Sequence, residues 1–490
     1  RMTGLRVYAL AAALAVSASS ASAQNGAQER AQDIRRIDSP IFADKVAKGE
    51  LPPIGERVPS DPRVVKVKIP GQHGGTMRVV FGRSKDTRIM VVYGYARLVT
   101  YDAEFNIQPD ILARVDVEHG RIFTLHLRKG HRWSDGHPFT AEDFRYWWED
   151  IANERALSPL GPAKQLVVAG ERAKVEFIDD HTIRYSWSSP NPHFLPALAS
   201  ATPLYLYRPA HYLKKFHMRY ADPKKLAAMV KKSGRRNWAA LHNRRDNQYK
   251  NDNPKLPTLQ PWVLKTKPPA QRFLFDRNPY FHRVDQNGRQ LPYTDRVAMG
   301  VAAAGVIPLK TGAGETDLQA RGIAFNNYTF LKEAEKRENF KVHLWKTAKG
   351  SHLALFPNLN AKDPAWRTLF QTVEFRRALS LAINRHEINQ VIYYGLAIEG
   401  QNTVLPASPL YKKAYLDAWA KFDLKAANAK LDALGLTQRD SRGVRLLPDG
   451  RPMEIIVETA GEDTEQTDVL ELIHDSWLAA GIKLFTRPSQ

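Results

Sequence analysis

The sequence predicts an α/β protein that folds as more than one compact unit. Its 490 residues exceed the size of an ordinary domain, for which roughly 150 residues is a useful guide. Strand-like and helix-like stretches alternate along the whole chain instead of being segregated. Apolar residues make up 43% and charged residues 25% of the chain. These shares are typical of a globular protein and exclude a wholly disordered chain.

Residues 1–23 have the layout of a secretory signal segment. Two arginines precede an apolar run of ten residues at 7–16, and 21–23 (ASA) is a small-residue cleavage site. Ten apolar residues are too few to cross a bilayer. We therefore expect cleavage before Gln24 and export of the remaining chain.

Cysteine is absent from the sequence. Disulfides, thiolate metal ligands, a cysteine nucleophile and a lipid-modified cysteine are thereby excluded. No later apolar run approaches the length of about 18 residues that a membrane span needs. The expected location is the periplasm, as a free protein.

The first strands and the first helix are predicted from local patterns. Residues 24–70, rich in proline, predict a loosely ordered lead-in. Residues 76–81 are typical of a strand, and 121–128 alternate between two faces as a half-buried strand does. Thr140, with acids in the turn that follows, can cap a helix. That helix would bury one apolar face, made of Phe144, Trp147, Trp148 and Ile151.

The second half repeats this mixture of elements. We expect strands at 174–178, 182–187, 453–457 and 482–485, and helices at 375–383, 424–434 and 469–480. Residues 300–314, small and apolar, suggest a crossover between lobes. The resulting division is a first lobe over 71–300, with a subdomain inserted near 93–250, and a second lobe over 301–490.

The chain is strongly basic, with a net charge of +21. Residues 208–250 hold thirteen Lys or Arg against two Asp. Such a stretch is most often a solvated face, although an anionic partner would also fit it. Export argues against nucleic acid as that partner.

Four stretches, in order, resemble one family. They are residues 107–113 (IQPDILA), 123–143 (FTLHLRKG to WSDGHPFTAED), 277–281 (RNPYF) and 375–388 (FRRALSLAINRHEI). Together they resemble the family 5 extracellular solute-binding proteins, the oligopeptide- and dipeptide-binding class of ABC importers. The resemblance covers about 71–490, and Asn384 stands where aspartate is common. Members continue beyond a segment like 481–486, so the chain resembles a C-terminally truncated member.

The resemblance implies a two-lobed periplasmic-binding-protein-like fold with an extra subdomain in the first lobe. A monomer would close its lobes over a peptide-sized solute and deliver it to the permease subunits in the inner membrane. No bond is broken, so neither an enzyme activity nor a cofactor is expected. Short peptides are the default ligand, and an oligosaccharide, an opine, a metal chelate or haem stays open.

Six residues are candidate ligand contacts. We expect a polar and aromatic loop at 93–97 after a strand, and a strand at 353–356 in the second lobe. Arg97 would pair with a ligand carboxylate, and the aromatic rings would stack on its apolar or ring portion. The candidates are Tyr93, Tyr95, Arg97, Trp262, His352 and Asn358.

Other chemistries are weaker readings of the same sequence. An exported enzyme acting on an acidic polymer would bind that polymer along the basic stretch. No catalytic motif in the sequence supports this function. The histidines between 119 and 137 match no compact zinc motif. Residues 311–316 lack the Gly-Lys-Ser/Thr of a phosphate loop, and no Gly-x-Ser-x-Gly elbow occurs.

Overall fold

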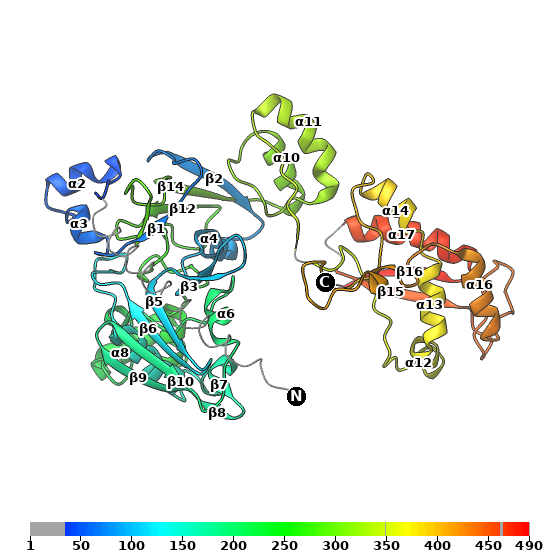
Figure 1. Ribbon diagram of the computed structural model, residues 1–490, viewed down its shortest axis with the longest axis horizontal. Helices are drawn as coiled ribbons and strands as arrows, with labels where there is room; N and C mark the ends of the chain where they lie inside the picture. The colour runs from blue at the N-terminus through cyan, green and yellow to red at the C-terminus, as the bar shows by residue number, and fades with distance from the viewer. Residues whose placement is uncertain (1–34, 348, 461–463, 490) are drawn as a thin grey trace, which may run out of the picture. The chain divides into compact units, whose positions relative to one another are not determined.

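The computed structural model describes residues 35–347, 349–460 and 464–489. The chain forms two compact units, divided between Ile323 and Ala324 (Figure 1). The proposed signal segment, 1–23, lies outside the described residues. No helix in the described ranges combines the length and apolar character that a membrane span requires.

One sheet of the first unit joins strands that are far apart in sequence. Its order is β11-β12-β14-β2, with β14 parallel to β2 and the other pairs antiparallel. The predicted strand at 76–81 is confirmed. The bounds are β2 (Thr76–Phe81), β11 (Trp262–Leu264), β12 (Arg272–Arg277) and β14 (Arg296–Val301). Alternate residues of these strands, such as Val79, Phe273 and Met299, are buried in one core.

A second sheet of the first unit is antiparallel throughout, in the order β5-β6-β10-β9. Its strands are β5 (Leu112–Glu118), β6 (Ile122–Leu127), β9 (Lys174–Asp179) and β10 (Thr182–Ser186). The predicted alternation is confirmed in β6, where Phe123, Leu125 and Leu127 are buried. They belong to a large core whose members lie almost entirely between Ala96 and Leu259.

Several helices and short hairpins surround this second sheet, whereas the helix at 89–94 packs against the core of the first sheet. The predicted helix start is confirmed: the Thr140 side chain accepts a hydrogen bond from the backbone N–H of Glu142, and Asp143 caps the Thr140 N–H in return. The bounds are α4 (Ile89–Gly94), α5 (Ala141–Arg145) continued by a π-helical turn (Tyr146–Ala152), α6 (Phe194–Ala199), α7 (Ala210–Leu213), α8 (Pro223–Ser233), α9 (Trp238–Arg245), β3 (Val99–Tyr101), β4 (Ile107–Pro109), β7 (Val167–Val168) and β8 (Glu171–Arg172).

The lead-in predicted as loosely ordered is folded from residue 35 onward. It contains a 3₁₀ turn, two short helices and one strand that pairs in parallel with β13. The buried guanidinium of Arg57 donates to the carbonyls of Pro52, at 2.8 Å, and Pro279, at 2.7 Å. The proline-rich lead-in is therefore an ordered segment that is bonded to the rest of the first unit. Its elements are Pro40–Phe42, α2 (Ala43–Ala47), α3 (Ile54–Arg57) and β1 (Arg63–Val65), with β13 at Arg283–Asp285.

The chain stays with the first unit beyond the crossover predicted at 300–314. That segment holds a 3₁₀ turn (Ala304–Val306) and α10 (Ile307–Gly312). The following residues return to β2: Asp317 forms an ion pair with Arg78 at 2.8 Å, and Gln319 donates to the carbonyl of Val80 at 2.7 Å. These contacts place the division of the chain after Ile323 rather than near residue 300.

The second unit packs helices around one parallel strand pair, β15 (Glu454–Thr459) and β16 (Lys483–Pro488). The three helices and the strands predicted at 453–457 and 482–485 are confirmed here, with small shifts of their ends. Trp477 is buried and its indole N–H donates to the carbonyl of Leu379 at 3.1 Å. The helices are a 3₁₀ turn (Phe325–Asn327), α11 (Tyr328–Glu338), α12 (Pro364–Gln371), α13 (Val373–Leu381), α14 (Arg385–Ile392), α15 (Lys413–Asp417), α16 (Leu424–Ala433) and α17 (Thr464–Ala479).

Candidate functional site

The segment 93–97 forms the end of a helix and the turn after it, instead of following a strand as the sequence predicted. Residues 89–94 form α4, and Tyr95 ends it in the left-handed conformation, with φ of 44°. The Tyr95 hydroxyl donates to the carbonyl of Ala199 at 2.6 Å and accepts the N–H of Tyr101 at 3.2 Å. The ring of Tyr95 is therefore tied by its polar end to the first unit.

Arg97 is buried, with 1% of its surface exposed. Its guanidinium donates to three backbone carbonyls, those of Ala96, Ser200 and Ala201, at 2.8–3.0 Å. Sequence analysis assigned this group to a ligand carboxylate. In the structure each of its three guanidinium nitrogens already donates to a carbonyl, so Arg97 holds the loop 199–201 in place.

Tyr93 and Trp262 are half-buried aromatic rings against the core of the first sheet. Tyr93 meets Phe81 edge to face, with ring centroids 5.9 Å apart, and burial raises the pKa of its hydroxyl. The Trp262 indole N–H donates to the carbonyl of Thr294 at 3.0 Å. The segments that carry the two rings lie side by side, because a Cβ at Gly94 would lie 2.7 Å from Pro261.

His352 and Asn358 belong to the second unit and lie on a loop. The strand predicted at 353–356 is wrong: the chain is irregular there, and Phe356 is 80% exposed. The exposed His352 ring lies 5.4 Å from the ring of Tyr393, and its Nδ1 lies 3.7 Å from a carboxylate oxygen of Glu465. Asn358 is exposed and accepts the backbone N–H of Asn360 at 3.0 Å.

A buried charged group that sequence analysis did not select lies beside Arg97. Asp110 is 1% exposed and accepts hydrogen bonds from the Arg97 backbone N–H and from the side chains of His282 and Arg283. Burial opposes its ionisation, but the charge of Arg283 and the contact with His282 outweigh it and hold the pKa of the carboxyl well below its usual range. The signal in the sequence was a single acid inside the apolar motif 107–113.

The clustered histidines serve several separate contacts. His131 lies 4.9 Å from His282, ring to ring, and both are buried. His137 stacks on His211 at 3.9 Å, while His126 meets Asp116 at 2.8 Å. Within the described ranges, no group of three or more potential ligands is placed to hold a metal ion.

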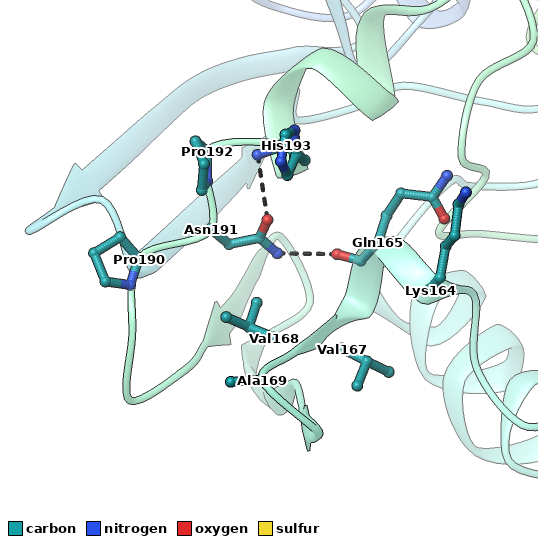
Figure 2. Close-up of a pocket in the computed structure, with 9 residues that line it drawn as sticks. All are labelled: Lys164, Gln165, Val167, Val168, Ala169, Pro190, Asn191, Pro192 and His193. Carbon is teal, nitrogen blue, oxygen red and sulfur yellow. Dashed lines mark hydrogen bonds between the residues drawn. The ribbon is translucent and has the colours of Figure 1, made fainter. Parts of the chain in front are cut away.

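Two shallow cavities of the first unit involve none of the six candidates. One, of about 250 Å³, lies between β7 and the turn at 190–193 (Figure 2). There the buried Asn191 amide donates to the carbonyl of Gln165 at 2.9 Å and accepts the N–H of His193, so it joins the two sides of the cavity. The other, of about 650 Å³, is lined by residues of 60–61, 126–129 and 179–182.

Comparisons with known proteins point to one family. The family model of the bacterial extracellular solute-binding proteins, family 5 Middle, matches residues 106–489. A periplasmic alpha-galactoside-binding protein of Rhizobium meliloti is 26% identical over 84% of this chain and 62% of its own length. The periplasmic oligopeptide-binding protein OppA of Salmonella typhimurium is 29% identical over 26% of this chain and 25% of its own.

Solved structures share the fold. An oligopeptide-binding protein OppA aligns with a TM-score of 0.71 and 34% identity, over 93% of this chain and 72% of that one. The periplasmic binding protein MelB of Agrobacterium fabrum, in complex with stachyose, aligns with a TM-score of 0.62 and 23% identity, over 93% and 71%. The predicted two-lobed fold class is thus confirmed. The chain spans less than two thirds of the length of the curated relatives that it matches most extensively.

Proposed function

Because this chain belongs to the family 5 bacterial extracellular solute-binding proteins, we propose that it is the solute-capturing component of an ABC importer. It binds a peptide-sized solute and delivers it to permease subunits in the inner membrane. The family match over residues 106–489 is the observation that carries this proposal. Binding energy comes from burying the solute, so the protein needs no catalytic group.

A short peptide is the first candidate ligand. Its support is the OppA structure, which at 34% identity is closer in sequence to this chain than MelB is. An oligosaccharide is the second candidate, since the alpha-galactoside-binding relative matches 84% of this chain. Half-buried aromatic rings suit both, because they stack on sugar rings and on apolar side chains alike.

The proposed contacts are a reduced set of the six candidates. Tyr93 and Trp262 offer partly exposed rings, and His352 and Asn358 offer exposed polar groups on the second unit. Arg97 and Tyr95 have their polar atoms engaged within the first unit, so we assign them to shaping the loop.

The ligand class can be settled on the protein isolated from its native host. Native mass spectrometry would identify a co-purified solute, and calorimetry would then compare short peptides with galactosyl oligosaccharides. We expect micromolar or tighter binding of one class, and recovery of that ligand unchanged. Trp262→Ala should weaken binding at least tenfold, while Trp345→Ala, which alters an exposed tryptophan of the second unit, serves as control. Turnover of the ligand, or no binding of either class, would contradict the proposal.

Export is part of the same proposal. Export is supported by the relatives that are named as periplasmic. Residues 1–23, which resemble a signal segment, would direct it. Amino-terminal sequencing of the protein released by osmotic shock should begin at Gln24. Retention of the segment in a cytoplasmic fraction would contradict this.

A further inference from the structure

The helix α8 (Pro223–Ser233) belongs to the first unit (Figure 1). Its charged residues lie on one side of the helix only. Successive residues of a helix are 100° apart, which places four lysines within an arc of about 120°. These are Lys224, Lys225, Lys231 and Lys232, and all four are exposed. The two pairs are separated by seven residues, or roughly 10 Å along the axis.

The opposite side of α8 is apolar and fixes the orientation of the helix. Leu226 is 6% exposed, and Met229 and Val230 pack against the same core. A helix held by that face cannot turn its lysines inward. The lysine face is therefore a permanent part of the surface of the first unit.

Two arginines extend the same cationic surface past the helix end. Gly234 ends α8 in the left-handed conformation, with φ of 66°, and exposed Arg235 and Arg236 follow it. The one acid at this helix, Asp222, uses its side chain to cap the N–H of Lys225 at 2.9 Å. We call the four lysines and two arginines the α8 cationic face.

Four other cations of the basic stretch 208–250, at Arg208, Lys214, Arg219 and Arg244, form ion pairs with nearby acids. Arg208 pairs with Asp246 at 2.6 Å, Lys214 with Glu142 at 2.9 Å, and Arg244 with Asp252 at 3.2 Å. By contrast, no member of the α8 cationic face forms an ion pair with another residue in the described ranges. Lys224 and Lys225 also occupy the first turn, where the helix dipole disfavours positive charge.

The α8 cationic face has the chemistry of a contact with a broad anionic surface. Lysines are flexible point charges without the bidentate geometry of arginine. Trp238, at the start of α9, packs partly buried against the core, and the exposed ring of Tyr220 is held by its hydroxyl on Asp150, so α8 itself carries no aromatic ring for stacking on bases. Neither cavity of the first unit takes a residue from α8. These features favour a charged plane over a pocketed ligand or a single-stranded nucleic acid.

We propose that the α8 cationic face binds the anionic phospholipid headgroups of a membrane surface. This inference concerns a surface distinct from the solute contacts and holds whatever the solute is. For a protein that hands its cargo to a membrane permease, such binding confines diffusion to the bilayer plane and raises the encounter rate. Each lysine near an anionic membrane surface strengthens binding roughly fivefold.

The test is flotation of the full chain with phosphatidylcholine vesicles, with and without phosphatidylglycerol. The variant K224Q/K225Q/K231Q/K232Q removes four charges and preserves helix propensity, since Gln and Lys are near equals. The matched control K66Q/K68Q/K265Q/K267Q removes four exposed lysines outside α8. Urea unfolding of all three proteins verifies that each is folded.

We expect the native sequence and the control to bind phosphatidylglycerol vesicles comparably and the α8 variant to bind roughly 600-fold more weakly, at about fivefold for each lysine removed. Binding should fall with added salt and be weak on pure phosphatidylcholine. Equal binding by the α8 variant, an equal loss in the control, or equal binding to both vesicle types would overturn the proposal. So would tighter binding to a short single-stranded DNA than to the anionic vesicles.

Discussion

The Nε2 atom of His282 lies 2.8 Å from Oδ1 of Asp110, with both side chains at most 1% exposed. Asp110 also takes both Nε–H and Nη2–H of Arg283, at 2.8 and 2.7 Å. Since the ionised carboxylate only accepts, the ring nitrogen that faces it must be the one that carries hydrogen. One buried acid thus joins the segments around residues 97, 110 and 282.

Asp110→Ala should destabilise the first unit by about 3–5 kcal/mol, because it leaves the largely buried guanidinium of Arg283 without its carboxylate partner. Urea unfolding measures this. Asp116→Ala is the control: that carboxylate is 47% exposed and pairs with Arg114 and His126 at the surface, so its loss should cost below about 1 kcal/mol. Equal effects of the two substitutions would contradict the assigned role of Asp110.

His282 makes the first unit sensitive to acid. Burial is the main cause that lowers the pKa of its ring to about 4, whereas an exposed histidine titrates near 6.5. The unfolded chain therefore takes up this proton first as the pH falls. The stability that His282 contributes is present above about pH 6.5 and is lost between there and pH 4, by an amount on the order of 3 kcal/mol.

The measurement for His282 is a difference between two proteins. His282→Gln can still donate to Asp110 but does not titrate, so its unfolding free energy should fall less between pH 6.5 and 4 than that of the native sequence. Two proteins must be compared because burial also raises the pKa of Asp143 to about 6. Protonation of Asp143 therefore changes the unfolding free energy in the opposite direction over the same pH range. Parallel curves for the two proteins would disprove the assignment.

His131→Leu should leave the first unit as stable as before, or more stable by about 1 kcal/mol. Both ring nitrogens of His131 are buried without a hydrogen-bond partner among the residues that the structure describes, and burial holds its pKa well below the ordinary value. An apolar side chain of similar volume avoids that desolvation. Chemical denaturation at pH 8 checks this, and a loss above about 2 kcal/mol would reveal a partner for the ring.

Arg97→Ala should reduce stability by about 3 kcal/mol or more, since three carbonyls lose a charged donor. Arg97→Lys should recover only part of this, because an ammonium cannot reproduce the fork of the guanidinium. If instead Arg97→Ala kept full stability and lost ligand affinity, the ligand-pairing role predicted from sequence would be restored.

Local patterns predicted the elements whose determinants are local. The capping pair Thr140 and Asp143 lies within one helical turn, and the alternation of buried and exposed residues in β6 depends only on its own six residues. Both predictions were correct because neighbouring residues determine these features. The helix α4 was missed because its apolar run, with Val91 and Val92, is equally typical of a strand.

The site was harder to predict because its contacts are long-range. Arg97 donates to the carbonyls of Ser200 and Ala201, which are more than a hundred residues away in the sequence. No pattern near position 97 predicts these contacts. The same holds for Asp110, whose partner His282 is 172 residues distant. The sequence could predict which polar groups lie near strand ends. Only the folded structure shows which of these groups bond within the protein and which can contact a ligand.

The pairing of β2 with β14 sets a condition on how the chain folds. Thr76 lies opposite Arg296, so the first strand of this sheet has no parallel partner until most of the first unit has been synthesised. Pairings of such high contact order form slowly. For a chain exported as we propose, slow pairing of β2 with β14 leaves the newly made polypeptide unfolded for longer, and an unfolded chain is the form that can pass through a translocation pore.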